Sequence, residues 1–310
     1  MQAIARSRVR ARRIRASAAT ALAAALATLA LSACGGTSTE DATRATAASR
    51  GGVDPKVTAL LPADLRNGGT LVAASDATYA PDEFIGEDGK TVVGMSADLA
   101  DALSRLLGVE IQLRNAPYDS IIPAIAAGRY DLVLSSMTDT KERQGTLDFV
   151  DYFVAGTTFY TRSDGPDVSG LADLCGHMVA AQKATTQQTD VQKQADACRA
   201  HDEPTLTPLV FPDQNAVNLA LSSGRADVAI ADSPVAYYQV KQSAGKFRIV
   251  GQTYGKAPYG IGVRHGSELV APLRAAVQQL IDDGTYGKIL ARWGNDAGAV
   301  KTAVVNGGKG

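Results

Sequence analysis

In most of this chain, short apolar segments with the character of strands alternate with helical patterns, and this alternation limits the possible folds. Strands are predicted at 70–74, 109–113 and 131–134, and a helix over 95–107 has its leucines on one face before Gly108 ends it. Such alternation is typical of βαβ units with a largely parallel sheet. The sequence therefore predicts an α/β protein whose ligands bind at the carboxyl ends of the strands.

Polar residues directly follow two of the predicted strands. The loop at 76–79 follows the first strand, and the loop Ser-Ser-Met-Thr at 135–138 follows the third. Thr140 is then a predicted N-cap, which places Arg143 in the first turn of a helix. The helix dipole disfavours a cation there, whereas the free backbone amides attract anions. The pattern indicates either an anion site that includes Arg143 or a solvated arginine on a surface helix.

One supersecondary unit occurs twice in the chain. Residues 127–131 (AGRYD) lead into LVLSS, and residues 223–227 (SGRAD) lead into VAIAD, with about 96 residues between the two copies. Both copies read as a helix, a glycine stop, Arg-x-Asp, an apolar strand and a polar exit. The repetition indicates two similar lobes that each offer a strand end, or one common helix-to-strand connection that is used twice.

The stretch DLVLSSMTDTKERQGTLDF, together with TYAP in the first exit loop, resembles the bacterial extracellular solute-binding proteins of family 3, which deliver amino acids to ABC importers. The resemblance covers roughly residues 69–295. It implies a two-lobed periplasmic-binding-protein fold of type II, each lobe a mostly parallel sheet flanked by helices. It also implies a discontinuous lobe 1 (68–162 plus 251–296), a lobe 2 at 163–250, and a C-terminal tail at 297–310 that we expect to be frayed.

The resemblance assigns a carboxylate site to both lobes. Arg143 would clamp the α-carboxylate of a free amino acid, with Ser136 and Thr138 beside it. Thr185-Thr186 would meet the same carboxylate from the second lobe, where they also serve as an N-cap. The family usually has glycine at the position of Ala184, so this chain departs from the pattern there.

The resemblance also assigns the ammonium and side-chain ends of the ligand. Asp232 would pair with the ammonium group, or it is an ordinary aspartate at a strand end. Tyr79 and Tyr118 would flank the ligand side chain, or they pack at the rim. Asp76, with Gln182 as a neutral polar neighbour, would accept hydrogen bonds from a cationic or amide side chain, or it caps local amides. An acidic ligand would face Asp76, so we expect a polar, uncharged or cationic L-amino acid: glutamine, arginine, lysine or histidine.

The N-terminus has the pattern of an export signal. A basic region at 6–15 precedes an apolar region at 16–31 that is short for a membrane span. The signal (1–33) ends in Leu-Ser-Ala before Cys34, which resembles a bacterial lipobox whose cysteine takes the lipid; the alternative is an ordinary signal peptide that is cut near Ala33. We expect residues 34–67 to form a flexible tether and the protein to be extracytoplasmic and lipid-anchored to the cell membrane.

Two further cysteines, Cys175 and Cys198, are an even count in an oxidising compartment. They predict one disulfide, and the alternative is two buried thiols. The three histidines and these cysteines show no spacing typical of metal ligands, so we expect no metal and no cofactor.

The charge balance bears on the partners. Six arginines and no acidic residue lie in residues 1–33, so the rest of the chain has 25 basic and 32 acidic residues, a net charge of −7. A mildly acidic chain without a basic stripe excludes nucleic acid as the expected partner.

The sequence therefore predicts a monomeric, lipid-anchored receptor that hands an amino acid to the permease of an ABC transporter. Hinge segments near 159–162 and 248–251 would absorb the closure of the lobes. It is predicted to have no catalytic residues, since nucleophile elbow, P-loop and HExxH motifs are missing from the sequence. The alternatives are a periplasmic enzyme of the same fold that dehydrates prephenate-like acids, which Asp232 argues against, and a sensing lipoprotein without a transport role.

The lipobox predicts the effect of one substitution. Cys34→Ser removes the thiol that would carry the lipid, so the protein should leave the membrane fraction and keep its fold. Fractionation with immunoblotting measures this, and circular dichroism controls for folding. An unchanged membrane-bound fraction would contradict the lipobox interpretation.

Overall fold

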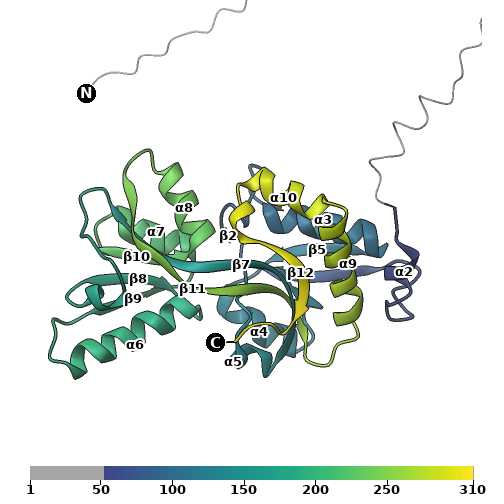
Figure 1. Ribbon diagram of the computed structural model, residues 1–310, viewed down its shortest axis with the longest axis horizontal. Helices are drawn as coiled ribbons and strands as arrows, with labels where there is room; N and C mark the ends of the chain where they lie inside the picture. Colours follow the sequence, from purple (N-terminus) through teal and green to yellow (C-terminus); the bar gives the residue numbers. More distant parts are fainter. Residues whose placement is uncertain (1–51, 310) are drawn as a thin grey trace, which may run out of the picture. The chain divides into compact units, whose positions relative to one another are not determined.

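Two long antiparallel strands, β7 (Leu147–Arg162) and β11 (Phe247–Arg264), run through both halves of the protein (Figure 1). The computed structural model describes residues 52–309. The first half of β7 pairs with the second half of β11 in one lobe, and their other halves pair in the other lobe. The register shifts twice between Val250 and Ala257, which is where the pair crosses from lobe to lobe. The expected two-lobed α/β architecture is observed.

The first lobe is built on the strand order β5-β1-β6-β11-β7. Strands β1 (Thr70–Ser75), β5 (Glu110–Asn115) and β6 (Leu132–Val133) are mutually parallel, and β11 joins them antiparallel. Helices cover this sheet with apolar faces, because their leucines and isoleucines recur at helical spacing. These helices are α3 (Met95–Leu107), α4 (Tyr118–Ala126), α9 (Val270–Asp282) and α10 (Thr285–Trp293).

The second lobe continues the same sheet in the order β7-β10-β8-β9. Strands β8 (Met178–Gln182), β9 (Thr207–Phe211) and β10 (Val228–Asp232) are parallel, while β7 lies antiparallel to β10. Three helices connect and cover these strands: α6 (Thr186–Ala200), α7 (Gln214–Ser222) and α8 (Ser233–Gln242).

Short elements complete the described chain. A separate three-stranded sheet lies between β1 and α3, and the helix α5 precedes β7. Their bounds are α2 (Pro55–Thr58), β2 (Thr78–Tyr79), β3 (Glu83–Ile85), β4 (Val92–Val93), α5 (Lys141–Gln144), the 3-10 helices η1 (Leu171–Leu174) and η2 (Asp296–Gly298), and β12 (Ala299–Val305).

The repeated Arg-x-Asp unit occupies equivalent places in the two lobes, which confirms that it marks two similar structures. Asp131 precedes β6, and its carboxylate accepts the backbone N–H of Val72 in β1 at 2.7 Å. Asp227 precedes β10, and its carboxylate accepts the backbone N–H of Met178 in β8 at 2.9 Å. In both cases the aspartate ties the start of one parallel strand to its neighbour and fixes their register.

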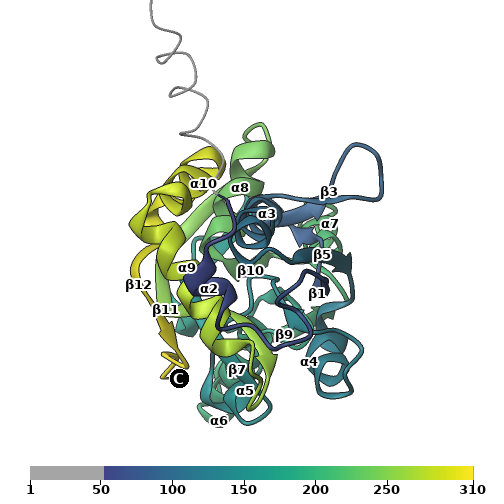
Figure 2. The same ribbon diagram turned by 90° about the vertical axis from the view of Figure 1, so that its right-hand side faces the viewer.

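The C-terminal segment is ordered, so the expectation of a frayed tail is wrong. β12 pairs antiparallel with β7, and in Figures 1 and 2 it lies beside α9. The α9 side chain of Gln278 accepts the backbone N–H of Ala303 at 3.0 Å, and Ala303 is fully buried. A segment with few large apolar residues is thus fixed by backbone pairing, which composition does not indicate.

Two further expectations need correction. Residues 54–61 were expected to belong to a flexible tether, but α2 begins there and Val57 and Leu61 are buried in the first-lobe core. The expected hinge segments 159–162 and 248–251 pair with each other inside the second lobe. The predicted signal peptide (1–33), Cys34 and residues 35–51 of the predicted tether lie outside the described residues.

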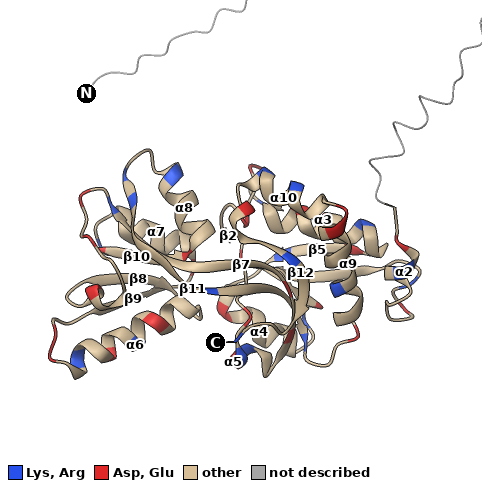
Figure 3. Cartoon of the chain, viewed as in Figure 1, with Lys and Arg blue, Asp and Glu red and all other residues tan. Residues whose placement is uncertain are grey.

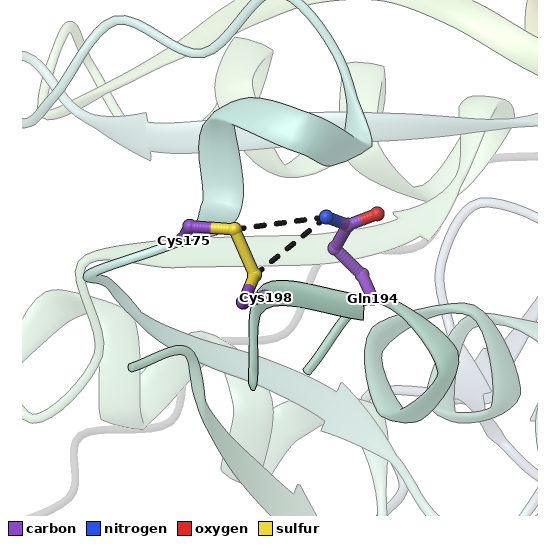
Figure 4. The surroundings of a disulfide bond; sticks show 3 residues. All are labelled: Cys175, Gln194 and Cys198. Carbon is purple, nitrogen blue, oxygen red and sulfur yellow. Dashed lines mark hydrogen bonds between the residues drawn. A yellow bond between two sulfur atoms is a disulfide. The ribbon is translucent and has the colours of Figure 1, made fainter. Parts of the chain in front are cut away.

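The predicted disulfide between Cys175 and Cys198 is present, with a Cα–Cα distance of 5.8 Å. It joins the end of η1 to the last turn of α6, and the side-chain amide of Gln194 lies within 3.7 Å of both sulfur atoms (Figure 4). Cys198 is buried in the second-lobe core. The bond therefore fastens α6 to the sheet that it covers.

Loss of this disulfide should lower stability without changing the fold. The bond closes a loop with a sequence separation of 23 residues, for which chain entropy gives about 3 kcal/mol of the free energy of unfolding. Urea unfolding of a Cys175→Ala, Cys198→Ala variant measures the difference from oxidised wild type. A reductant should lower the wild type by a similar amount and leave the variant unchanged; equal stability of variant and oxidised wild type would contradict the prediction.

Candidate ligand-binding site

A small, mostly enclosed cavity lies between the two lobes, at the carboxyl ends of the parallel strands. Six of the nine predicted ligand contacts line it, whereas Asp76, Arg143 and Thr186 lie beside it. The structure therefore brings together side chains that are up to about 150 residues apart in the sequence. The lining residues are Tyr79, Tyr118, Ser136, Thr138, Gln182, Thr185, Gln187, Gln214, Ile230, Ala231 and Asp232.

The exit loop after β6 rests on two buried carboxyl groups. Ser136 has a φ of 44°, a left-handed conformation that is unusual for serine. Its hydroxyl lies 3.1 Å from a carboxyl oxygen of Asp82 and 3.2 Å from one of Glu83. Burial raises the pKa of Asp82 to about 7 and raises the pKa of Glu83 well above its ordinary value. These hydrogen bonds hold the Ser136 backbone in the conformation that turns the loop toward the cavity.

Arg143 follows this loop and is 9% exposed. Thr140 caps α5 as predicted by accepting the backbone N–H of Arg143. The guanidinium donates to the backbone carbonyl of Thr138 at 2.7 Å, and it lies 5.6 Å from the ring centre of Tyr118. None of the ion pairs among residues 52–309 includes Arg143. A buried guanidinium without a carboxylate partner is costly, and a bound anion would offset that cost.

Asp76, at the end of β1, is buried and accepts two side-chain hydrogen bonds. Thr78 Oγ1 donates to it at 2.9 Å, and Gln182 Nε2 donates to it from the second lobe at 2.7 Å. Burial raises its pKa above the ordinary value for an aspartate, although both hydrogen bonds oppose that rise. The carboxylate therefore accepts N–H groups from the direction of the cavity as well as a local hydroxyl.

The second lobe contributes the N-terminus of α6. Thr185 Oγ1 accepts the backbone N–H of Gln188 at 3.1 Å, so Thr185 is an N-cap as well as a cavity residue. Thr186 is the first residue of the helix. Ala184, which stands where glycine is usual, has a φ of 63°. The loop keeps the left-handed backbone without glycine, and the carbonyl of Ala184 accepts a hydrogen bond from Arg143 at 3.1 Å.

Asp232 lies at the end of β10 and faces the cavity. Gln187 Nε2 donates to its carboxylate at 2.7 Å. Burial raises the pKa of Asp232 to about 6, and the neighbouring Tyr259 and Gln187 side chains and the charge of Arg143 oppose this rise. At neutral pH the group is a carboxylate inside the cavity.

Two tyrosines form an apolar wall with polar tips. The rings of Tyr79 and Tyr118 pack edge to face with 5.8 Å between their centres. Both residues are buried, and the Tyr79 hydroxyl has no hydrogen-bond partner within residues 52–309. The pair offers aromatic surface for the side chain of a ligand and the unpaired Tyr79 hydroxyl beside it.

Contacts between the lobes surround the cavity. Lys183 of the second lobe pairs with Asp119 of the first at 2.8 Å. The backbone N–H of Gln214 lies 3.2 Å from Thr78 Oγ1. Together with the contacts from Gln182 and Arg143 they hold the lobes against each other, so the structure shows the closed arrangement.

Sequence reasoning missed Gln187 and Gln214. Gln187 lies in the first turn of α6 and bridges Asp232 to Thr157, whose hydroxyl is 3.1 Å away. Gln214 begins α7, after β9, a strand that the sequence analysis did not predict. The sequence does predict the helix 213–223, which Asp213 caps by accepting the N–H of Ala216, but without β9 this helix start is not recognised as a strand exit.

The site does not have the composition of a metal centre or a nucleic-acid surface. No group of three or more histidine, cysteine or acidic residues suited to a metal ion occurs in the part of the chain that the structure describes. Figure 3 shows basic and acidic residues interspersed over both lobes, without a basic stripe in that view. Within residues 52–309, no helix is long and apolar enough to cross a membrane.

Two lobes that are joined by crossing strands and closed over a polar cavity define the class of two-lobed solute-binding proteins. The chain belongs to the bacterial extracellular solute-binding proteins, family 3, whose pattern matches residues 71–296.

Similar proteins of known description support this assignment. The arginine-binding protein ArgT of Corynebacterium glutamicum is 33% identical over 253 residues, which cover 81% of this chain and 83% of that protein. The extracellular arginine-binding protein ArtP of Bacillus subtilis is 28% identical over 228 residues, 72% of this chain and 85% of that protein. The structure of an ancestral arginine-binding protein bound to arginine is 36% identical, with a TM-score of 0.68 over 73% of this chain and 98% of that one. All three are described as binding proteins.

The backbone at Ala184 generates a prediction about stability. Ala184→Gly should raise the free energy of unfolding by about 1 kcal/mol, because glycine adopts the left-handed conformation without the clash of a Cβ atom. Thermal and urea unfolding measure the change. The control is Ala197→Gly within α6, which should lower stability by about 1 kcal/mol because the backbone there is helical. A loss of stability in Ala184→Gly would contradict the prediction.

Proposed function

We propose that this protein binds a free L-α-amino acid with a cationic side chain, arginine first among them, and delivers it to an ABC importer from a lipid-anchored position outside the membrane. The observation that carries the proposal is the charge of the site. One buried guanidinium, Arg143, has no carboxylate partner among the described residues, and two carboxylates, Asp76 and Asp232, lie near it. A ligand with one anionic and two cationic groups balances this set.

The carboxylate of the ligand would lie between Arg143 and the N-terminus of α6. Arg143 offers charge-assisted N–H donors, and Thr138 and Thr185 line the cavity next to it. The free backbone amides of the first turn of α6 favour an anion at the same place. Since both lobes would contact one carboxylate only when they are closed, ligand binding would favour the closed arrangement.

The ammonium group of the ligand would pair with Asp232. This carboxylate faces the cavity and is held in place by Gln187. Burial disfavours the charged form of Asp232, because the carboxylate loses contact with water. A bound ammonium group would therefore stabilise the carboxylate.

The ligand side chain would extend along Tyr79 and Tyr118 toward Asp76. Gln182 Nε2 already donates to Asp76 at 2.7 Å, so this carboxylate accepts an N–H group of the kind that an arginine or glutamine side chain carries. A guanidinium also stacks favourably on a tyrosine face. Aspartate or glutamate would bring a second carboxylate to Asp76 without a further cation in the cavity lining to offset it.

The lobes would open by bending the crossing strands. Residues 154–157 of β7 and 252–258 of β11 carry the register shifts between the two lobe sheets, so fewer ladder hydrogen bonds oppose bending there. The lobe limits at 162/163 and 250/251 therefore lie several residues inside the second lobe, and we propose these crossing segments as the hinge.

Binding, rather than catalysis, accounts for the arrangement of the site. A dehydratase acting on a prephenate-like dicarboxylate would place an anion near Asp232 and Asp76, which repel it. The same cavity would serve transport or sensing, and relatives described as arginine- and glutamine-binding proteins of ABC transporters favour transport.

Ligand screening tests the proposed function. L-arginine should raise the melting temperature of the protein more than the other nineteen amino acids, because binding stabilises only the folded state. Calorimetric titration then gives the affinities of L-arginine and L-glutamate. Glutamate or aspartate binding more tightly than arginine, lysine, histidine and glutamine would contradict the assignment of Asp76.

Affinity for L-arginine should depend on pH through Asp232. Its pKa in the closed structure is raised to about 6, and the ammonium group needs the carboxylate form, so affinity should fall as pH decreases through that range, by up to about tenfold per unit. Calorimetric titrations at several pH values between roughly 4.5 and 8 measure this dependence. Asp232→Asn should bind weakly at all these pH values and lose most of the dependence; an unchanged profile would contradict the role of Asp232.

Removal of the guanidinium should abolish most of the affinity. Arg143→Ala should cost roughly 3 kcal/mol of binding free energy, over a hundredfold in Kd, because the ligand carboxylate loses charge-assisted hydrogen bonds. Arg199→Ala, at an exposed arginine of α6, is the control and should bind as wild type does. A change of less than about threefold for Arg143→Ala would rule out the clamp.

A further inference from the structure

The last described residues return to the loop that carries Arg143. After β12, Asn306 exchanges two hydrogen bonds with the backbone of Phe149: its N–H donates to the carbonyl at 3.0 Å, and its side-chain oxygen accepts the N–H at 2.8 Å. Gly307 donates its N–H to the Asp151 carboxylate at 2.9 Å. Gly308 donates its N–H to the Asp139 carboxylate at 2.8 Å. We call Asn306, Gly307 and Gly308 the C-terminal clasp.

The clasp holds both ends of the segment that contains Arg143. Gln144 Nε2 donates to Asp139 at 2.7 Å and to the carbonyl of Gly308 at 3.2 Å. Asp139, Gln144 and Gly308 therefore form one closed set of hydrogen bonds, and Arg143 lies within the segment that this set closes. The segment needs this support, because α5 has only four residues and cannot sustain itself.

The fit of the clasp requires glycine at its last position. Gly308 is buried although it lies two residues from the chain end. A Cβ atom at this position would overlap the backbone carbonyl group of Asp139. The backbone of residue 308 is thus in direct contact with the backbone that leads into Arg143, with no side chain between them.

The clasp also supplies donors to two buried acidic groups. Asp139 and Asp151 are 1% and 4% exposed. Burial, and after it the charge of Asp139, raise the pKa of Asp151 to about 7. The N–H groups of Gly307 and Gly308 each donate to one of these carboxyl groups. Removal of the clasp would take this donor from Asp151 and would leave Asp139 with the Gln144 amide as its side-chain donor.

We propose that the C-terminal clasp is a positioning element of the carboxylate clamp, and that it holds Arg143 in the orientation in which the guanidinium meets the ligand carboxylate. The inference rests on the proposed function of Arg143. The clasp contacts neither the cavity nor the ligand, and it acts through Asp139 and Gln144.

A general loss of stability would also weaken binding, so the test uses two ligands. L-argininamide carries a neutral amide in place of the carboxylate and is otherwise the same as L-arginine. If the clasp positions Arg143, its disruption weakens the binding of L-arginine far more than the binding of L-argininamide. Only L-arginine has a carboxylate that pairs with the Arg143 guanidinium. If the clasp only stabilises the fold, its disruption weakens the binding of both ligands equally.

The variants are Gly308→Ala and, as a matched control, Gly287→Ala in α10, where a Cβ atom has no neighbour within 4 Å. Gly308→Ala should lower the affinity for L-arginine by at least about tenfold and the affinity for L-argininamide by less than about threefold, as expected when a charge-assisted contact is lost. Gly287→Ala should match wild type for both. L-argininamide is measured by competition against L-arginine.

Hydrogen exchange without ligand separates this inference from the proposed function. In the ligand-free protein, the amides of residues 139–147 should exchange faster in Gly308→Ala, and in a chain that ends at Val305, than in Gly287→Ala. Unchanged exchange there, or equal weakening of the two ligands, overturns the role of the clasp. Failure of wild type to bind L-arginine overturns the proposed function and leaves exchange to decide the clasp.

Discussion

The structure depends on the pairing of β7 with β11, which belong to both lobes at once. One half of each strand belongs to the sheet of the first lobe, and the other half belongs to the sheet of the second. The parallel strands β5-β1-β6 and β10-β8-β9 therefore flank one shared antiparallel pair, which we call the seam. The units lie alongside the seam with their carboxyl ends toward the cavity between the lobes, so their exit loops meet at the same place. The seam also explains how the halves can move, because two of its register shifts lie where the ladder passes from lobe to lobe.

Electrostatics then distinguishes this cavity from ordinary packing between lobes. Buried acidic groups surround one buried guanidinium, and their pKa values are raised because water is excluded. Such a site is unfavourable when empty and gains most from a ligand whose charges alternate in the same order. Gln182 and Arg143 belong to this charged set and also make contacts between the lobes, so the closed arrangement is held in part by the residues of the cavity.

Much of the frame could be predicted from the sequence, because local signals carry it. Alternating apolar patterns located β1, β5, α3 and β10, and the repeated Arg-x-Asp unit indicated two lobes whose aspartates now prove equivalent. The seam could not be predicted, since β11 mixes apolar, polar and glycine residues without a regular period and its partner β7 lies about 100 residues away in the sequence. Gln187 and Gln214 resemble surface residues, and only the fold places their amides in the cavity. The contacts of Gly307 and Gly308 are made by backbone N–H groups, which leave no trace in composition.

The order of the segments along the chain has a consequence for assembly. The parallel strands of the second lobe, its three helices and its disulfide all lie between residues 175 and 242, so this half holds most of its own partners. The other half needs β11, α9, α10 and β12, which come last in the sequence. Because synthesis starts at the N-terminus, the second lobe can gain its parallel strands and its cross-link while the first still lacks strands. A chain that ends at Val305 would keep every strand and the cross-link of the second lobe, whereas the first would lack the hydrogen bonds that Gly307 and Gly308 make to Asp151, Asp139 and Gln144.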